Sequence, residues 1–395
     1  MPGQVFDAGG IPMAVYFDHN ATTPLAPEAL DAMSRALGED FGNPSSVHQY
    51  GQRAKGLLDD ARSAVASLIG AEAAEIVFTG SGTEADNLAV RGAAEALEPA
   101  GRRHLVTAGF EHEAVLNTVK ALGKRGWRVT FLPVDSTGII DHMALESVMA
   151  DDTALVSVMH ANNEIGTVQP IQSLARIAHA RGALFHTDAV QSAGKIPVDV
   201  RALEVDLLSL SAHKINGPKG AGALWIKRGV RLVPTMTGGK HERNRRAGTE
   251  NVAGIAGFGA AATVSRRKLA SDSTRLGQLR DRLERGVLSR VQGTQVNGAT
   301  TSRVPNTTNI SFEGVEAEAL LIALDLEGFA VSTGSACSSG TLEPSHVLRA
   351  MGLSQHRAQN SIRFSLGLGN DERQVDALLE KLPALVEKLR ALVRR

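Results

Sequence analysis

The sequence has only one cysteine, Cys337, among its 395 residues. A single cysteine rules out an internal disulfide and indicates a reducing compartment. It also cannot hold an iron–sulfur cluster by itself. Paired cysteines and the HExxH motif are both missing, and the histidines are scattered along the chain, so we expect no metal site.

The chain also has no formal net charge, because its 42 basic residues balance 42 acidic ones. No strong field therefore draws the chain to nucleic acid or to a membrane surface. No apolar run reaches membrane-spanning length, and residues 1–12 lack the charged and apolar regions of a signal peptide. We expect a soluble cytoplasmic protein without a direct nucleic-acid or membrane partner.

Short apolar segments do occur, and they alternate with segments of helix length from residue 76 onwards. Such alternation is typical of an α/β protein whose mostly parallel sheet is covered by helices on both faces. The expected strands are 76–79, 105–108, 128–131, 155–159, 184–187, 207–210 and 222–226.

The pattern changes near residues 265–275, where a long charged helix begins and after which strands return at 309–312. We place a domain boundary there. The expected large domain is 22–268, and a smaller α+β domain combines 1–21 with 269–395. The last segment, from Asp371 onwards, has leucine and valine on one face and is expected to be a packing helix, with partner binding as the alternative.

The segment 205–220 is an apolar strand that ends at Lys214 and then runs into glycines. Ligands collect outside the carboxyl ends of parallel strands. Burial beside His213 and apolar neighbours would favour a free amine that can attack a carbonyl. The alternative is that Lys214 is a surface residue that closes the strand.

Asp188 follows another apolar strand, one crossover before Lys214. The two side chains are therefore expected to emerge on neighbouring strands at one sheet edge. A lysine for a Schiff base and an acid for the pyridine nitrogen are what pyridoxal phosphate needs most. The turn that contains Ser81, Gly82 and Thr83 precedes a helix and suits a phosphate, although an ordinary capped helix start explains it nearly as well.

Other polar residues follow strands too. His112 is a candidate acid–base group or a flat ring to stack on a cofactor, and a loop histidine is the alternative. Asn163 lies in a segment that offers amides to a substrate. Cys337 lies among small polar residues that predict an exposed loop, where a thiol can act as a nucleophile. Arg363, within a strand, needs an anionic partner, either a substrate carboxylate or a structural salt bridge.

With these segments in view, the sequence resembles the cysteine desulfurases of the NifS/IscS type, in the class V group of pyridoxal-phosphate enzymes. The resemblance covers nearly the whole chain. It rests on the segments 17–24, 211–214 with 217–220, 246–251, 334–337 and 361–367.

The resemblance implies a homodimer with the aminotransferase fold (PLP fold type I), built on a seven-stranded, mostly parallel sheet in the large cofactor-binding domain. Lys214 would bind pyridoxal 5′-phosphate covalently, Asp188 would face the ring nitrogen, Gln191 would reach the ring hydroxyl and His112 would stack on the ring. The residues implied for the phosphate are Gly82, Thr83, Ser211 and His213, with Thr249 from the other subunit. Those implied for the substrate carboxylate are Asn163 and Arg363.

The implied reaction converts L-cysteine to L-alanine and leaves the sulfur on Cys337, in the small domain, as a persulfide. A sulfur-acceptor protein would then serve iron–sulfur cluster assembly, other thio-cofactors or tRNA. Two alternatives stay open. One is another class V enzyme, an aminotransferase or a selenocysteine lyase, and the other is a non-catalytic interaction module with the same fold.

Overall fold

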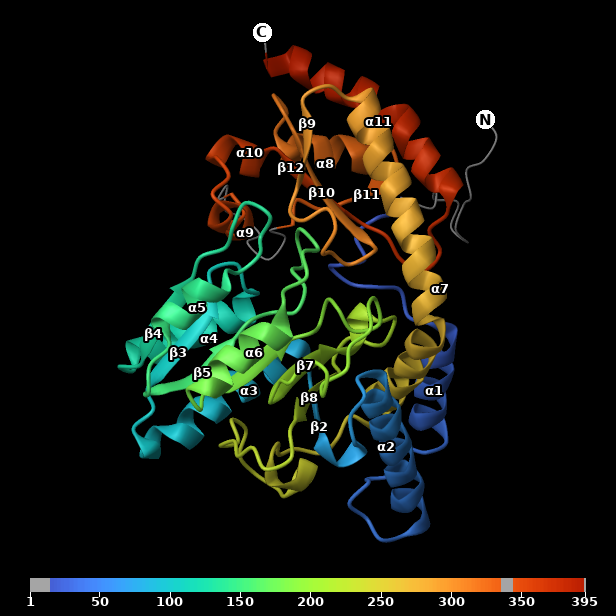
Figure 1. Ribbon diagram of the computed structural model, residues 1–395. Coiled ribbons are helices and arrows are strands. Elements are labelled where there is room, and N and C mark those ends of the chain that lie inside the picture. Colours follow the sequence, from blue (N-terminus) through green and yellow to red (C-terminus); the bar gives the residue numbers. More distant parts are fainter. Residues whose placement is uncertain (1–14, 335–343, 394–395) are drawn as a thin grey trace.

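The computed structural model describes residues 15–334 and 344–393 of the chain. Figure 1 shows two parts. The larger part contains a central sheet with helices on both sides, and the smaller part contains a second sheet and the C-terminal helix. The long helix α7 (Val252–Arg290) runs from one part into the other. Cys337 lies outside the described residues.

The central sheet has seven strands in the order β2-β8-β7-β6-β5-β3-β4. All neighbours pair in parallel except β8, which is antiparallel to both β2 and β7. The expected seven-stranded, mostly parallel α/β sheet is thereby confirmed. The strands are β2 (Ile76–Thr79), β3 (His104–Ala108), β4 (Arg128–Leu132), β5 (Thr153–Ser157), β6 (Leu184–Asp188), β7 (Leu207–Ser211) and β8 (Gly222–Ile226).

Successive residues of the central strands pack into different cores, because side chains alternate across a sheet. Leu105 and Leu207 pack with α3 and α4, whereas Val106 and Leu208 pack with the helices of the opposite face. Continuous apolar runs follow from burial on both faces, as the sequence indicated. The helices around this sheet are α1 (Pro27–Gly38), α2 (Gln49–Leu68), α3 (Gly82–Leu97), α4 (Glu113–Lys124), α5 (His142–Val148), α6 (Ile171–Ala180) and α9 (His346–Ala350). Helix α10 (Gln355–Gln359) lies beside the second sheet.

The smaller part is built on an antiparallel sheet in the order β12-β10-β9. Phe312, Phe364 and the buried face of α11 form its core together with Phe17 from the start of the chain. A short parallel pair, β1 with β11, lies beside it. The elements are β1 (Val15–Tyr16), β9 (Thr294–Asn297), β10 (Thr307–Phe312), α8 (Ala317–Leu326), β11 (Phe329–Ala330), β12 (Ser361–Ser365) and α11 (Glu372–Val393).

Helix α7 passes straight through the predicted boundary at residues 268–269. Its first half contributes Ile255 and Phe258 to the core of the larger part, and its second half contributes Leu279 and Leu283 to the core of the smaller one. The change of core therefore falls inside one helix. Leu348, in α9, packs into the larger core although the sequence assigned 269–395 to the small domain. The division into 22–268 and 1–21 with 269–395 stays a prediction.

Among the described residues, none of the helices combines the length and the apolar character needed to cross a membrane. Within residues 15–334 and 344–393, no group of three or more histidine, cysteine, aspartate or glutamate side chains is arranged to hold a metal ion.

The second half of α7 should contribute strongly to stability. Leu283 is 0% exposed, and Leu288 of the same helix is 42% exposed. Leu283→Ala should lower the free energy of unfolding by about 2–5 kcal/mol, because it removes apolar contacts and leaves a cavity. Leu288→Ala, the matched control, should cost about 0.5 kcal/mol or less. Urea unfolding followed by circular dichroism measures both, and equal losses would contradict this packing.

Candidate active site

The carboxyl ends of β6 and β7 bring together two side chains that the sequence singled out. The strands pair in parallel with Asp188 opposite Ser209, and β7 ends at Ser211. Lys214 follows in a single 3₁₀ turn, Ala212–Lys214. The expected placement of Asp188 and Lys214 at one sheet edge is confirmed.

A cavity of about 330 Å³ opens at this edge, where α3 also begins. Ten of the predicted site residues line it: Gly82, Thr83, His112, Asn163, Asp188, Gln191, Ser211, His213, Lys214 and Arg363. Thr249 is exposed and is not among the lining residues, and Cys337 lies outside the described residues.

The Lys214 amine is held by the backbone of the segment that follows β1. Its Nζ donates to the carbonyl oxygens of Asn20 and Ala21 at 2.6 and 2.7 Å. The amine therefore lies at the cavity wall in a defined position, as a nucleophile toward a carbonyl must.

Asp188 is a buried carboxylate on the same wall. Its Oδ1 accepts a hydrogen bond from the Val190 amide at 2.8 Å. Burial raises the pKa of Asp188, and the nearby His112 and Lys214 oppose that rise. Two further buried acids, Asp86 and Glu111, have pKa values well above the usual range, mainly because of desolvation. A carboxylate in such surroundings fits a positively charged ring nitrogen, which would compensate its loss of solvent.

The turn before α3 contains the helix cap that was one of its two readings, and it also lines the cavity. Ser81 caps the helix, since its hydroxyl accepts from the Glu84 amide at 3.1 Å. Gly82 and Thr83, in the first turn, line the cavity. A β-carbon at Gly82 would lie 3.0 Å from Val190 Cγ2 and 3.1 Å from Ser211 Cβ, so a side chain would crowd this position. The helix N-terminus is thus both capped and open to an anion such as phosphate.

His213 lies at the same end of the cavity. Its Nδ1 is 3.1 Å from the Thr22 hydroxyl. Burial and the positive charges of Lys214 and Lys219 lower the pKa of His213 to about 4, so the ring is neutral at pH 7. An anion in the cavity would be compatible with these positive charges.

His112 is the N-cap of α4, which defines the state of its ring. Its Nδ1 accepts a hydrogen bond from the Ala114 amide at 3.1 Å. The proton of the neutral ring must then be on Nε2. Burial lowers the pKa of His112, which favours this neutral form. A neutral ring in the cavity wall suits stacking on a flat cofactor, and protonation of Nδ1 would break the cap.

Arg363 has the structural salt bridge that was one of its two expected partners. Its Nη2 lies 2.7 Å from Asp18 Oδ1, and Nη1 donates to the Asn163 carbonyl at 2.9 Å. Among the described residues, Arg363 Nε finds no hydrogen-bond partner. The guanidinium is buried, lines the cavity and retains capacity for an anion beyond Asp18.

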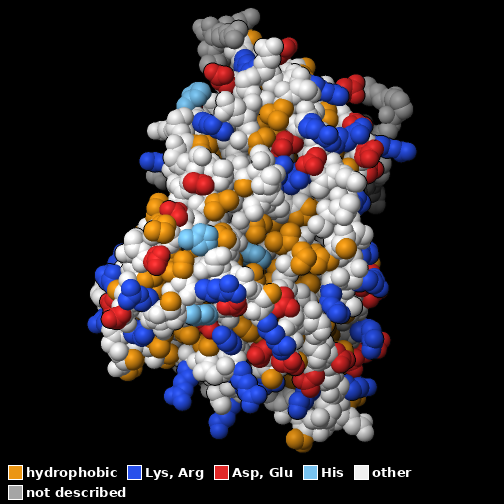
Figure 2. All heavy atoms as spheres, viewed as in Figure 1, with side chains coloured by type: hydrophobic (Ala, Val, Ile, Leu, Met, Phe, Trp, Pro, Cys, Tyr) orange, Lys and Arg blue, Asp and Glu red, His pale blue; other side chains and the backbone are white. Residues whose placement is uncertain are grey.

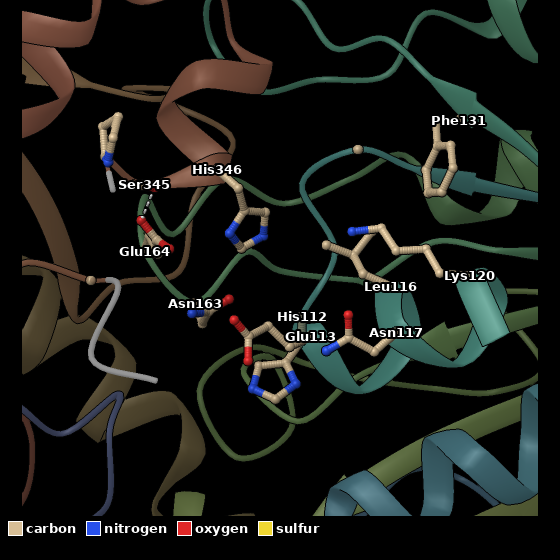
Figure 3. Close-up of a pocket in the computed structure, with 13 residues that line it drawn as sticks. His112, Glu113, Leu116, Asn117, Lys120, Phe131, Asn163, Glu164, Ser345 and His346 are labelled. Carbon is tan, nitrogen blue, oxygen red and sulfur yellow. Dashed lines mark hydrogen bonds between the residues drawn. The ribbon is translucent and has the colours of Figure 1, made fainter. Parts of the chain in front are cut away.

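A second cavity of about 470 Å³ adjoins the first and shares His112, Asn163 and Gly334 with it. Figure 3 shows His112 and Asn163 in its wall, with Glu164 beside Ser345. Ser345 Oγ donates to Glu164 Oε2 at 2.5 Å, and burial raises the pKa of Glu164.

Sequence reasoning missed several residues that build the site. Asn20 lies in a polar turn after a short strand, a signal that pointed to a loop but to no role. Lys195 is close enough to Gln191 to donate to its side chain, and Asp86 lines the cavity floor from α3. Neither of the last two carries a sequence signal, because each contact forms only after the chain folds.

Comparisons with known proteins agree with this geometry. Residues 15–378 match the aminotransferase class-V family. The chain belongs to the class V aminotransferase family. A cysteine desulfurase IscS from Dictyoglomus turgidum is 48% identical over 378 residues, which is 96% of each chain.

Solved structures resemble this chain as well. A NifS-like protein superposes with a TM-score of 0.90 at 38% identity, over 95% of this chain and all of the other. A structure described as SspA in complex with cysteine has a TM-score of 0.80 at 35% identity, over 89% of this chain and 98% of that one. The expected family, fold type and enzyme class are confirmed. Members of this family depend on pyridoxal phosphate, so the expected cofactor is confirmed too.

The two roles of His112 can be separated by substitution. His112→Asn keeps an N-cap but removes the ring, whereas His112→Ala removes both. We expect His112→Ala to lose about 1 kcal/mol of stability and His112→Asn to stay within a few tenths. Both should weaken cofactor binding, because the flat ring is gone. Thermal unfolding of the cofactor-free proteins and absorbance titration with pyridoxal phosphate measure the two effects, and normal cofactor affinity in His112→Asn would refute the stacking role.

Proposed function

We propose that this protein is a cysteine desulfurase that converts L-cysteine to L-alanine and transfers the sulfur to Cys337. The observation that carries the proposal is the cavity in which Lys214, Asp188 and the N-terminus of α3 meet. Its full-length similarity to cysteine desulfurases supports the choice of substrate. The sole cysteine, in the motif 334–337, supports the choice of sulfur carrier.

Except for Thr249, each proposed cofactor residue lines the cavity. Bound pyridoxal phosphate would supply an electron sink for the bonds that change at the substrate. Lys214 would bind it covalently and then move protons, and Asp188 would keep the ring nitrogen protonated. His112 would stack on the ring, and Gln191 would contact the ring oxygen. The phosphate would be bound by Gly82, Thr83, Ser211 and His213, with Thr249 from the partner.

The substrate carboxylate would be recognised by Asn163 and Arg363. Both line the cavity, and Arg363 Nη1 donates to the Asn163 carbonyl at 2.9 Å, which links the two residues. The Arg363 guanidinium pairs with Asp18, and its Nε has no hydrogen-bond partner among the described residues. It therefore favours an amino acid with a free carboxylate over an amine without one.

The proposed sulfur transfer balances without another reagent. The Cys337 thiolate attacks the substrate sulfur, so an S–S bond forms while the C–S bond breaks. The electron pair of the C–S bond stays on carbon, which takes up a proton and leaves as alanine. The product on the protein is a persulfide, which a sulfur-acceptor protein would consume for iron–sulfur assembly or other thio-cofactors. The lone cysteine supports a reducing, cytoplasmic setting.

We also propose a homodimer. Thr249 is exposed here and does not line the cavity of its own chain. The end of α1 and the chain leading to α2 expose Leu37, Phe41 and Val47 by 68%, 66% and 92%. Apolar residues exposed to this extent suit a surface that a second copy covers.

The reaction is tested by incubating the cofactor-bound protein with L-cysteine and a reducing thiol. Alanine and sulfide should appear in equal amounts. Lys214→Ala should lose the visible absorption of the bound cofactor and all activity. Cys337→Ser should keep the absorption and yield almost no sulfide, because the sulfur has no acceptor.

Other outcomes would identify the alternatives. Keto acid instead of alanine would indicate an aminotransferase, and turnover of selenocysteine but not cysteine would indicate a lyase. A wild-type protein that binds no cofactor would indicate an interaction module. Wild-type sulfide output from Cys337→Ser would refute the persulfide step.

A mixed dimer tests whether Thr249 acts across the interface. Thr249→Glu places a negative charge against the phosphate and should abolish cofactor binding in its homodimer. When it is paired with Lys214→Ala, one site receives both substitutions and the other receives neither. Purified mixed dimers should therefore regain about half of the wild-type activity. If Thr249 acts within its own chain, the mixed dimers will show no gain over the two homodimers.

A further inference from the structure

A buried cation lies directly behind the active-site cavity. Lys195 follows β6 and is only 9% exposed. Its Nζ donates to Gln191 Oε1 at 2.5 Å and to Asn20 Oδ1 at 3.0 Å. Both acceptors are uncharged amide oxygens. Burying an ammonium group against neutral acceptors is costly, so stability alone is a poor reason for this lysine.

The Lys195 contacts define the orientation of the Gln191 amide. A protonated lysine side chain is an ammonium group, which can only donate hydrogen bonds. The Gln191 atom 2.5 Å away is therefore the oxygen. On its other side, Gln191 Nε2 lies 3.0 Å from the Asn20 carbonyl oxygen, which can only accept. An inverted amide would place N–H groups against an ammonium and an oxygen against a carbonyl.

The Asn20 side chain, one of the two acceptors of Lys195, is itself fixed by hydrogen bonds. Its Oδ1 accepts from Lys195 and from Asn306 Nδ2, at 3.0 and 3.1 Å. Its Nδ2 donates to Thr307 Oγ1 and to the Asn163 carbonyl, at 2.8 and 3.0 Å. The side chain of Asn20 is fully used, so it cannot replace Lys195 as a donor to Gln191.

One N–H of Gln191 remains after these contacts, and Gln191 lines the cofactor cavity. We infer that Lys195 is a positioning residue for Gln191 that holds the amide with this N–H available to the ring oxygen of the cofactor. The inference rests on the proposed function, in which Gln191 contacts that oxygen.

The surroundings of Lys195 agree with this role. Burial and the positive charges of Lys214 and Arg363 lower the pKa of Lys195 well below its usual value. A neutral amine can also accept, but the Asn20 carbonyl oxygen only accepts, so Gln191 Nε2 faces it and Oε1 faces Lys195 in either state. Lys195 also lines a further cavity of about 340 Å³, together with His19 and Lys214.

The test is a pH titration of the visible absorption of the cofactor-bound protein. An N–H donated to the ring oxygen stabilises negative charge there. Without that donor, the same charge holds a proton more tightly on the nitrogen that joins the cofactor to Lys214. Lys195→Met should therefore raise the pH midpoint of the absorption change by about one unit, a tenfold change in the proton affinity of that nitrogen. The dissociation constant for pyridoxal phosphate should rise several-fold.

Two further variants separate orientation from charge and from folding. Lys195→Gln keeps an N–H donor without charge and should shift the midpoint by less than half as much as Lys195→Met. Arg280→Met removes another cation that is 9% exposed, bonded to Asp281 and Val304 away from the site. It should lower thermal stability but leave the midpoint unchanged.

A double-mutant cycle decides whether Lys195 acts through Gln191. In a protein that already carries Gln191→Ala, Lys195→Met should cause little further shift of the pH midpoint. The same full shift in that background, or no shift in the wild-type background, would overturn the inference. If Lys195→Met does not fold, the cycle is run with Lys195→Gln, and additive shifts would again overturn it. A wild-type protein without visible absorption would instead refute the proposed function.

Discussion

The parallel pairing of β6 with β7 is the constraint on which the rest of the site depends. It places Asp188 opposite Ser209, so that the chain leaving β7 delivers Lys214 to the same edge. The order of the sheet then brings β5 and the N-terminus of α3 to that edge as well. Parallel strands end together, so residues distant in sequence meet without further devices. A shift of one residue in this register would turn Asp188 to the other face.

Around that edge, hydrogen bonds connect the polar groups to one another. Asn20 receives hydrogen bonds from Lys195, Lys214 and Gln191, and it donates to the Asn163 carbonyl. Asn163 in turn receives one from Arg363. Residues proposed for the cofactor and residues proposed for the substrate therefore share one buried network. Such a network is rigid when every member is satisfied, and it makes single substitutions felt at a distance.

Figure 2 shows hydrophobic side chains gathered across the middle of one face, between more charged regions above and below.

The sequence predicted the sheet well because its evidence was local. Apolar runs bounded by glycine and proline indicated seven strands, and all seven are present. The boundary between the two parts was harder, because the charged residues near 266–268 mark a surface stretch of α7 and not its start. Helix α7 begins at Val252, after the N-cap Asn251, and glycines in its first half pack closely against α1 and α2, which composition alone does not reveal.

By itself, the sequence determined the fold class and the family, and it predicted the roles of Lys214, Asp188 and Cys337. These conclusions rest on short motifs, whose residues and spacing can be read from the sequence without knowing the fold. Only the tertiary structure decided that His112 caps α4, that Arg363 pairs with Asp18, and that Lys195 donates a hydrogen bond to Gln191. Each of these depends on the position of individual hydrogen-bonding atoms. Those positions exist only once the strands and helices have packed, since no local pattern encodes which donor will meet which acceptor.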